Sequence, residues 1–276
     1  MMRQRMACVV AVAGLAVMWL AGGMAYAGPY DTAVMADSPF LYYRFEEGGG
    51  PTAIDTAGGD QNGTYLGGVT LGQPSATPGL GSSGLFAGTD DRIDLPALSS
   101  YSQHSIEMWI NTNGLAGGCC TSLYSTDTWG SGSLHYNIKS GRDIEHALNG
   151  GNPANVNTPG GVIQDGNWYH LVATYDATAN GNVEIYIDGA NQNVGSHNTT
   201  TQINLTTGGE IGTWGLGRDF IGNIDEVAMY ASVLSEARVL AHYEAASEPD
   251  RIPEPATMCL LGLGLAALVR RRRKNQ

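Results

Sequence analysis

The chain has 276 residues, of which 42% are hydrophobic, only 14% are charged and 39 are glycine. Between Gly28 and Ile252 there are 25 acidic residues (the chain's 26 less Glu254) and 7 basic ones, because the other seven of its 14 Arg and Lys lie in the end segments. The resulting net charge of −18 repels nucleic acid and anionic membranes, which excludes both as main partners of this region.

The first 27 residues have the three parts of a secretory signal peptide. Arg3 and Arg5 give a basic start, an apolar run covers 7–20, and Ala25-Tyr26-Ala27 forms an A-x-A cleavage site before Gly28. We therefore expect cleavage after Ala27 and an exported protein.

The middle of the chain is a series of short apolar strands separated by turn residues, with few helical patterns. A helical turn at Thr32–Asp37, capped by Asp31, comes first, and a helix at Glu236–Glu244, capped by Ser235, comes last. This order predicts an all-β antiparallel sandwich or jelly roll with one short C-terminal helix. The expected strands are Phe40–Phe45, Thr64–Leu71, Leu85–Phe86, Arg92–Leu95, Ser105–Ile110, Thr121–Tyr124, Ser133–Ile138, Asp143–Leu148, Trp168–Asp176, Asn182–Asp188, Glu210–Trp214 and Asn223–Tyr230.

The clearest strand pair is a hairpin near the middle of the expected sheet. Val183, Ile185 and Ile187 alternate with polar or aromatic neighbours, which is typical of a half-buried strand. The preceding segment, Trp168–Asp176, is apolar on both faces, as in a strand that is covered on both sides. Asn180-Gly181 between them favours the left-handed backbone of a tight reversal.

Only two cysteines lie in the expected domain, and they are adjacent. Because an exported chain meets an oxidising compartment, Cys119 and Cys120 are candidates for a vicinal disulfide or an intermolecular bridge. A loop without functional chemistry is the plainer interpretation. No other Cys or His stands at metal-ligand spacing around the pair, which argues against zinc.

The C-terminal segment combines three features. Pro253-Glu254-Pro255 precedes an apolar run, 256–269, and then the basic cluster 270–274. Fourteen helical residues reach about 21 Å, short of a hydrocarbon core of roughly 30 Å, so the run is a marginal anchor. The combination resembles the PEP-CTERM sorting signal of exported bacterial proteins. The resemblance implies processing by an exosortase near Pro253-Glu254-Pro255 after a transient stay in the inner membrane through 256–269. It also implies a final location at the cell surface or in the extracellular matrix of a Gram-negative-type bacterium. A plain tail anchor is the alternative.

Four stretches of the middle segment resemble LamG-like domains of the concanavalin A-like lectin/glucanase group. They are FLYYRFEEGGGPTAIDTAG (40–58), SIEMWINT (105–112), NWYHLVATYD with GNVEIYIDG (167–189), and FIGNIDEVAMYASVLSEARVLAHY (220–243). The resemblance implies a jelly-roll sandwich. The chain then divides into a signal peptide (1–27), a LamG-like domain (28–248) and a sorting segment (249–276).

The resemblance also implies a calcium site, because in such domains the loop after the first strand lies near the Asp of the closing strand. These positions correspond to Asp55 and Asp225 here, with Asp60 and Asn62 as further oxygen donors of the kind that calcium prefers. We expect such an ion to stiffen the loops rather than catalyse. The alternative is that Asp55 closes a turn and Asp225 bonds to backbone.

Carbohydrate binding needs exposed aromatic rings, and four rings lie in or near polar, glycine-rich loops: Tyr124, Trp129, Tyr136 and Trp214. They are the candidate ligand contacts, although loop aromatics also cover core edges. Trp109, Trp168 and His170 lie on strands and are expected in the core.

Catalysis is not expected. Glycoside hydrolysis needs two carboxylates flanking the sugar bond. The motif Glu-x-Asp-x-x-Glu, which carries both in laminarinase-type relatives of the fold, does not occur. The adjacent Asp225 and Glu226 are expected on opposite strand faces. The sequence thus predicts a non-catalytic surface module that binds a glycan, an exopolysaccharide or a surface protein. A structural matrix protein without a small ligand and a divergent glycoside hydrolase are the alternatives.

Overall fold

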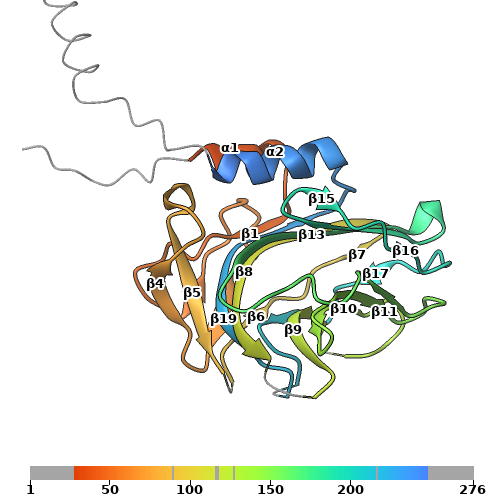
Figure 1. Cartoon of the computed structure of the whole chain (residues 1–276), viewed down its shortest axis with the longest axis horizontal. Helices are drawn as coiled ribbons and strands as arrows, with labels where there is room; N and C mark the ends of the chain where they lie inside the picture. Colours follow the sequence, from red (N-terminus) through yellow and green to blue (C-terminus); the bar gives the residue numbers. More distant parts are fainter. Residues whose placement is uncertain (1–27, 89, 116–117, 127, 216, 248–276) are drawn as a thin grey trace, which may run out of the picture.

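The computed structural model describes residues 28–247, apart from 89, 116–117, 127 and 216. Two large antiparallel sheets pack face to face, and two helices lie side by side on the outer face of one sheet (Figure 1). The predicted signal peptide with Ala25 and Ala27, and the sorting segment with Pro253, Glu254 and Pro255, lie outside the described residues. The predicted all-β sandwich is confirmed.

The first sheet has nine strands among the described residues. Its order is β15-β14-β13-β8-β19-β5-β4, with β1 also paired to β19 and β16 to β14. The strands are β1 (Leu41–Tyr43), β4 (Thr70–Pro74), β5 (Ser82–Ala87), β8 (Gln103–Leu115), β13 (Trp168–Asp176), β14 (Asn182–Ile187), β15 (Ala190–Asn191), β16 (Gly195–Ser196) and β19 (Phe220–Tyr230).

The second sheet has eight strands within the described part of the chain, in the order β12-β11-β10-β9-β18-β6-β3-β2. They are β2 (Thr52–Ala53), β3 (Gly63–Leu66), β6 (Arg92–Leu95), β9 (Cys120–Ser125), β10 (Leu134–Lys139), β11 (Ile144–Leu148), β12 (Asn155–Asn157) and β18 (Gly209–Ile211). A small third sheet pairs β7 (Ser100–Tyr101) with β17 (Ile203–Asn204).

The central hairpin forms as predicted. Leu171 on β13 pairs with Ile187 on β14, and the pairing continues to Asp176 opposite Asn182. Asn180, at φ 57°, provides the left-handed backbone of the reversal. Since side chains alternate along a strand, one face of this hairpin packs between the two sheets and the other packs under the helices.

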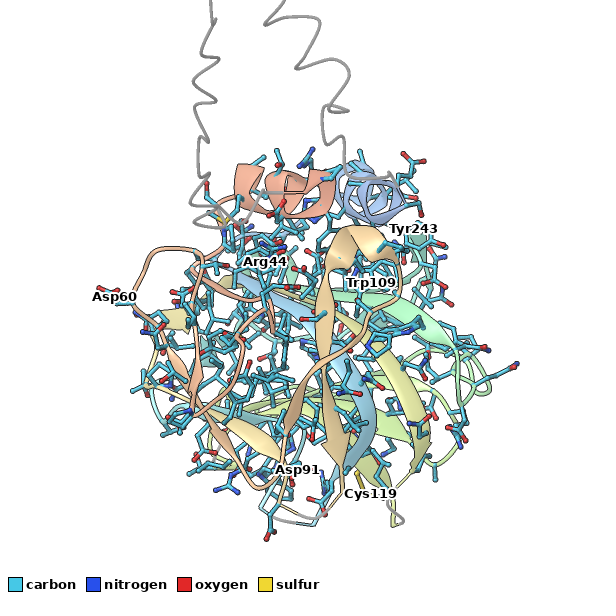
Figure 2. The ribbon with its side chains drawn as sticks, turned by 90° about the vertical axis from the view of Figure 1, so that its left-hand side faces the viewer. Arg44, Asp60, Asp91, Trp109, Cys119 and Tyr243 are labelled. Atoms are coloured by element: carbon cyan, nitrogen blue, oxygen red, sulfur yellow. A yellow bond between two sulfur atoms is a disulfide. The ribbon has the colours of Figure 1, made fainter. Side chains whose placement is uncertain are left out.

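The two helices are α1 (Pro29–Ala36) and α2 (Glu236–Ala246). Beneath them, side chains from the outer face of the first sheet form a second apolar cluster that includes Trp109, Val172 and Tyr186. Figure 2 shows Trp109 and Tyr243 together on this side of the molecule. The helices therefore cover the face of the first sheet that is turned away from the second. In the part of the chain that the structure describes, no helix has the length and apolar character to cross a membrane.

The expected single strand at Thr64–Leu71 is wrong. The chain leaves the second sheet after β3 and enters the first sheet as β4, with Gly67 at φ 75° between them. A Cβ at Gly67 would lie 2.4 Å from the carbonyl oxygen of Asp90, so the close approach requires glycine. Asp91 holds the crossing, because its carboxylate accepts bonds from the backbone N–H groups of Gly68 and Ala87.

Three local details also differ from the expectation. The first helix begins at Pro29, so Asp31 lies in its first turn and pairs with Arg44 instead of capping. Ser235 stands at the cap position of α2, but its side chain makes no capping bond. Residues 149–161, in which the sequence predicts no strand, contain the short strand β12, which pairs with β11. Whether this segment forms a strand depends on its backbone pairing with β11, which local propensity alone does not determine.

Candidate functional site

The outer face of the second sheet carries polar side chains that alternate with core residues. On β10, Tyr136 and Ile138 point into the core, whereas His135, Asn137 and Lys139 occupy the other face. Together with β9, β11, β12 and the loop after β18, they line a cavity of about 240 Å³. Because ligand pockets usually measure roughly 300–1,000 Å³, this cavity suits one small group, such as a single sugar ring.

Two tryptophans flank a histidine at this cavity. The His135 ring centroid lies 4.5 Å from that of Trp129 and 4.7 Å from that of Trp214. The Trp129 side chain is 42% exposed, and the guanidinium carbon of Arg218 lies 4.4 Å from the Trp214 ring centroid. The two candidate tryptophans are thus brought together, 85 residues apart in sequence, as an aromatic wall.

The polar wall of the cavity contains one compensated charge pair. Lys139 Nζ lies 2.9 Å from Glu145 Oε1, and Asn137 Nδ2 donates to Glu145 Oε2 at 2.8 Å. Burial and the charge of Arg218 lower the pKa of His135 to about 4, so its imidazole is neutral at pH 7. The Nε2 atom of His135 and the Oδ1 atom of Asn137 are buried and have no hydrogen-bond partner within the described structure.

The adjacent cysteines form a vicinal disulfide that borders the cavity. Cys119 is exposed and Cys120, the first residue of β9, is buried. Figure 2 places Cys119 at the end of the sandwich opposite the two helices. Of the options left open by the sequence, the structure shows the intrachain bridge, and it lies beside the tryptophans.

The expectation that Tyr124 and Tyr136 offer exposed rings is wrong. The two residues pair across β9 and β10, and both side chains are fully buried in the core between the sheets. On β10 the physical reason is the strand alternation that turns His135 and Asn137 outward.

The Asp55 carboxylate closes its loop by accepting four backbone N–H groups. The donors are Tyr42 at 2.9 Å, Ala57 at 3.0 Å, Gly59 at 3.2 Å and Gln61 at 3.1 Å. Asn62 belongs to the same arrangement, since its Oδ1 accepts from the Asp55 N–H at 2.8 Å. Asp60 is exposed on the outlying loop that Figure 2 labels.

Asp225 is completely buried on β19, away from solvent. Its carboxylate accepts bonds from the Ser75 hydroxyl and, at 2.8 Å, from the N–H of Glu226. Burial and the neighbouring Glu226 raise the pKa of Asp225 well above its usual value, which favours a protonated, uncharged group over a cation ligand.

These four residues do not fit a calcium site well. The oxygens of Asp55 are already used by backbone donors, and among the described residues no three His, Cys, Asp or Glu side chains are arranged to hold a metal ion. The geometry matches the alternative, in which Asp55 closes a turn and Asp225 bonds to backbone. Calcium binding stays a prediction.

Several cavity residues were not singled out from the sequence: His135, Asn137, Lys139, Glu145 and Arg218. A signal was present on β10, where three polar side chains alternate with core residues. Nothing in the sequence places Arg218 next to them, because the contact depends on how the loop after β18 folds back over β9 and β10.

The chain belongs to the concanavalin A-like lectin/glucanases superfamily, whose family model matches residues 87–240. A second model, the PEP-CTERM protein-sorting motif, matches residues 251–274 and indicates an exported protein that is sorted to the cell surface. A search of curated protein sequences finds no match.

Solved structures similar to the chain include domain 4 of AbnA, an extracellular arabinanase from Geobacillus stearothermophilus, in complex with arabinotriose. That pair has 19% identity and a TM-score of 0.58, and the match covers 76% of this chain and 98% of the other. The botulinum neurotoxin serotype D ligand binding domain, in complex with N-acetylneuraminic acid, has 16% identity and a TM-score of 0.59 over 76% of this chain. A structure of botulinum neurotoxin type C, whose cell entry depends on interaction with two ganglioside molecules, has 17% identity and a TM-score of 0.60 over 79% of this chain. The match covers about half of each neurotoxin chain, 52% and 53%, and these likenesses show the shared fold.

Proposed function

We propose that this exported protein binds carbohydrate at the cell surface through the cavity between Trp129 and Trp214. The observation that carries the proposal is the aromatic wall that these two rings form with His135 outside the core. Aromatic faces pack against the apolar faces of sugar rings, and nearby polar groups bind hydroxyls. Asn137, in the polar wall of the cavity, has an acceptor oxygen that is unpaired among the described residues and could bind such a hydroxyl.

The cavity lies away from the two ends of the described chain. Both ends of the described chain, Gly28 and Ser247, adjoin the helices α1 and α2, whereas Cys119 beside the cavity lies at the opposite end of the sandwich (Figure 2). Processing by an exosortase near Pro253-Glu254-Pro255, with only transient contact with the inner membrane, is the proposed route to the cell surface.

Two other functions have weaker support. A catalytic glycosidase site would need a reachable carboxylate pair. Asp225 and Glu226 are both completely buried, and among the described residues that line the cavity, Glu145 is the one carboxylate. A matrix protein without a small ligand, or one that binds a surface protein, does not explain why Trp129 is exposed beside the cavity. Nor does it explain why Asn137 Oδ1 has no hydrogen-bond partner among the described residues.

The test is binding of the protein, expressed as the full-length chain and purified, to a panel of neutral and acidic oligosaccharides, with calcium and with a chelator. Trp129→Ala and Trp214→Ala should each weaken binding about 10-fold, since a lost stacking contact costs roughly 1–1.5 kcal/mol. Leu240→Ala is the control, because Leu240 is also 42% exposed but lies on α2. A folded protein that binds no sugar, or variants that bind like the wild type, would remove the proposal.

A further inference from the structure

The domain neutralises nearly all of its own cations. Six basic side chains lie in the described residues, and five of them pair with a carboxylate, whereas Arg218 has no such partner among these residues. The five pairs are Arg44–Asp31, Arg92–Asp94, Lys139–Glu145, Arg142–Asp165 and Arg238–Asp37. In a domain with many more acidic than basic residues, a cation without a carboxylate partner is unusual, and this one lines the cavity.

Arg218 is held in a way that keeps its hydrogen-bonding groups available. Its guanidinium lies 4.4 Å from the Trp214 ring centroid, a cation–π contact that orients the group and uses none of its N–H donors. A planar guanidinium is suited to bind both oxygens of a carboxylate at once. The neighbouring Lys139 is already paired with Glu145, so Arg218 provides the local positive charge.

A second observation also points to a missing ligand. The Oδ1 atom of Asn137 and the Nε2 atom of His135 are buried in the wall of the cavity and have no hydrogen-bond partners among the described residues. The two side chains are 0% and 3% exposed. An unpaired buried polar atom is unfavourable, and a ligand with several hydroxyls would provide the missing partners. A neutral apolar group would satisfy neither atom.

We propose that the cavity takes an acidic saccharide, a sugar whose carboxylate pairs with Arg218 while its ring packs against the tryptophans and a hydroxyl donates to Asn137. The inference rests on the proposed carbohydrate binding and adds the ligand class. The strongly negative domain repels anions in general, so an acidic sugar is held by this local pairing rather than by the overall field.

The test compares acidic oligosaccharides with uncharged forms of the same sugars. Oligomers of galacturonate, of mannuronate and guluronate, and of glucuronate are titrated into the protein by calorimetry, each beside its methyl ester. We expect at least one acid to bind at least 10-fold more tightly than its ester, because hydrogen bonds to charged groups are the strong ones. Arg218→Gln should abolish the difference between acid and ester, and Arg218→Lys should reduce it.

Arg142→Gln is the matched control, because it also removes one positive charge but its partner is Asp165, on the surface. It should leave both affinities unchanged. Equal binding of acid and ester, tighter binding of a neutral sugar, or an equal effect of Arg142→Gln and Arg218→Gln would overturn the acidic ligand and leave carbohydrate binding intact. Binding of no sugar by the folded protein would overturn both proposals.

Discussion

Glu107 offers the sharpest test of how the helices are attached to the first sheet. It is fully buried on β8, and its carboxylate accepts hydrogen bonds from the hydroxyls of Tyr30 and Tyr230, each at 2.8 Å. His170 Nε2 lies 2.8 Å from Oε1, and His242 Nδ1 lies 3.0 Å from Oε2. One side chain thus joins α1, α2, β13 and β19.

Replacing Glu107 by Ala removes the shared acceptor of the two tyrosine hydroxyls, of His170 Nε2 and of His242 Nδ1. Removing one partner from a buried ion pair costs about 3–5 kcal/mol, a large part of the stability of an ordinary domain. Glu107→Gln keeps the size and one acceptor oxygen but removes the charge, so we expect a loss of about 1–3 kcal/mol. Glu184→Gln, on the half-buried Glu184 of β14, is the control and should cost less than about 1 kcal/mol.

The same cluster predicts a pH dependence. Burial lowers the pKa of His242, but the charges of Glu107 and Asp37 outweigh it and raise the pKa above its usual value. Its contribution is therefore fully present below about pH 6.5 and is lost as the pH rises through the raised pKa. Burial alone would raise the pKa of Glu107, whereas His242 and His170 bring it well below its usual value, so its contribution is lost only in strong acid.

Urea unfolding, followed by tryptophan fluorescence at several pH values, measures these effects. The midpoint should fall for both Glu107 variants, and the loss of wild-type stability above pH 6.5 should be smaller in Glu107→Gln. If the free energy of unfolding of Glu107→Ala is within about 1 kcal/mol of the wild-type value, the cluster does not attach the helices as described. The same conclusion follows if the stabilities of the wild type and Glu107→Gln change with pH in the same way.

The cavity and the Asp55 loop provide three more tests. A carboxylate bound beside Arg218 should raise the pKa of His135 from about 4, and an NMR titration without a shift at saturation would contradict the contact. Reduction of the Cys119–Cys120 bridge should change Tm by less than about 2 °C, because adjacent residues close almost no chain loop. It should weaken ligand binding in calorimetry, because both cysteines line the cavity. A large drop in Tm would contradict the first expectation. Asp55→Ala should lower the free energy of unfolding by about 2–4 kcal/mol with or without calcium, and a stabilisation by Ca²⁺ that this variant loses would instead establish the metal site.

Much of the fold could be predicted from the sequence because its signals are local. The alternation of Val183, Ile185 and Ile187 decides which face of β14 meets the core, and Asn180-Gly181 decides where the hairpin turns. His170 is the fully buried residue that its apolar strand predicts. The domain boundaries and the sorting motif are likewise linear patterns.

The candidate site was predicted only in part. Trp129 and Trp214 lie at the cavity, as expected of aromatic residues in polar loops, whereas Tyr124 and Tyr136 face the core. A one-residue change of register turns a strand side chain to the other face, and the sequence of β9 and β10 alone leaves that register open. The calcium prediction rests on a family resemblance and is still untested.

Strand periodicity and turn residues, which act over a few neighbouring positions, were enough to predict an antiparallel sandwich, and the linear sorting motif was enough to predict export. Which residues meet across the sheets was decided only by tertiary structure. His135 meets Trp214 and the charge of Arg218 because β10, β9 and β18, from distant parts of the chain, pair side by side. The nineteen short strands of the described residues could pair in many ways, and hydrogen-bond pairing together with the close packing of the core selects one of them.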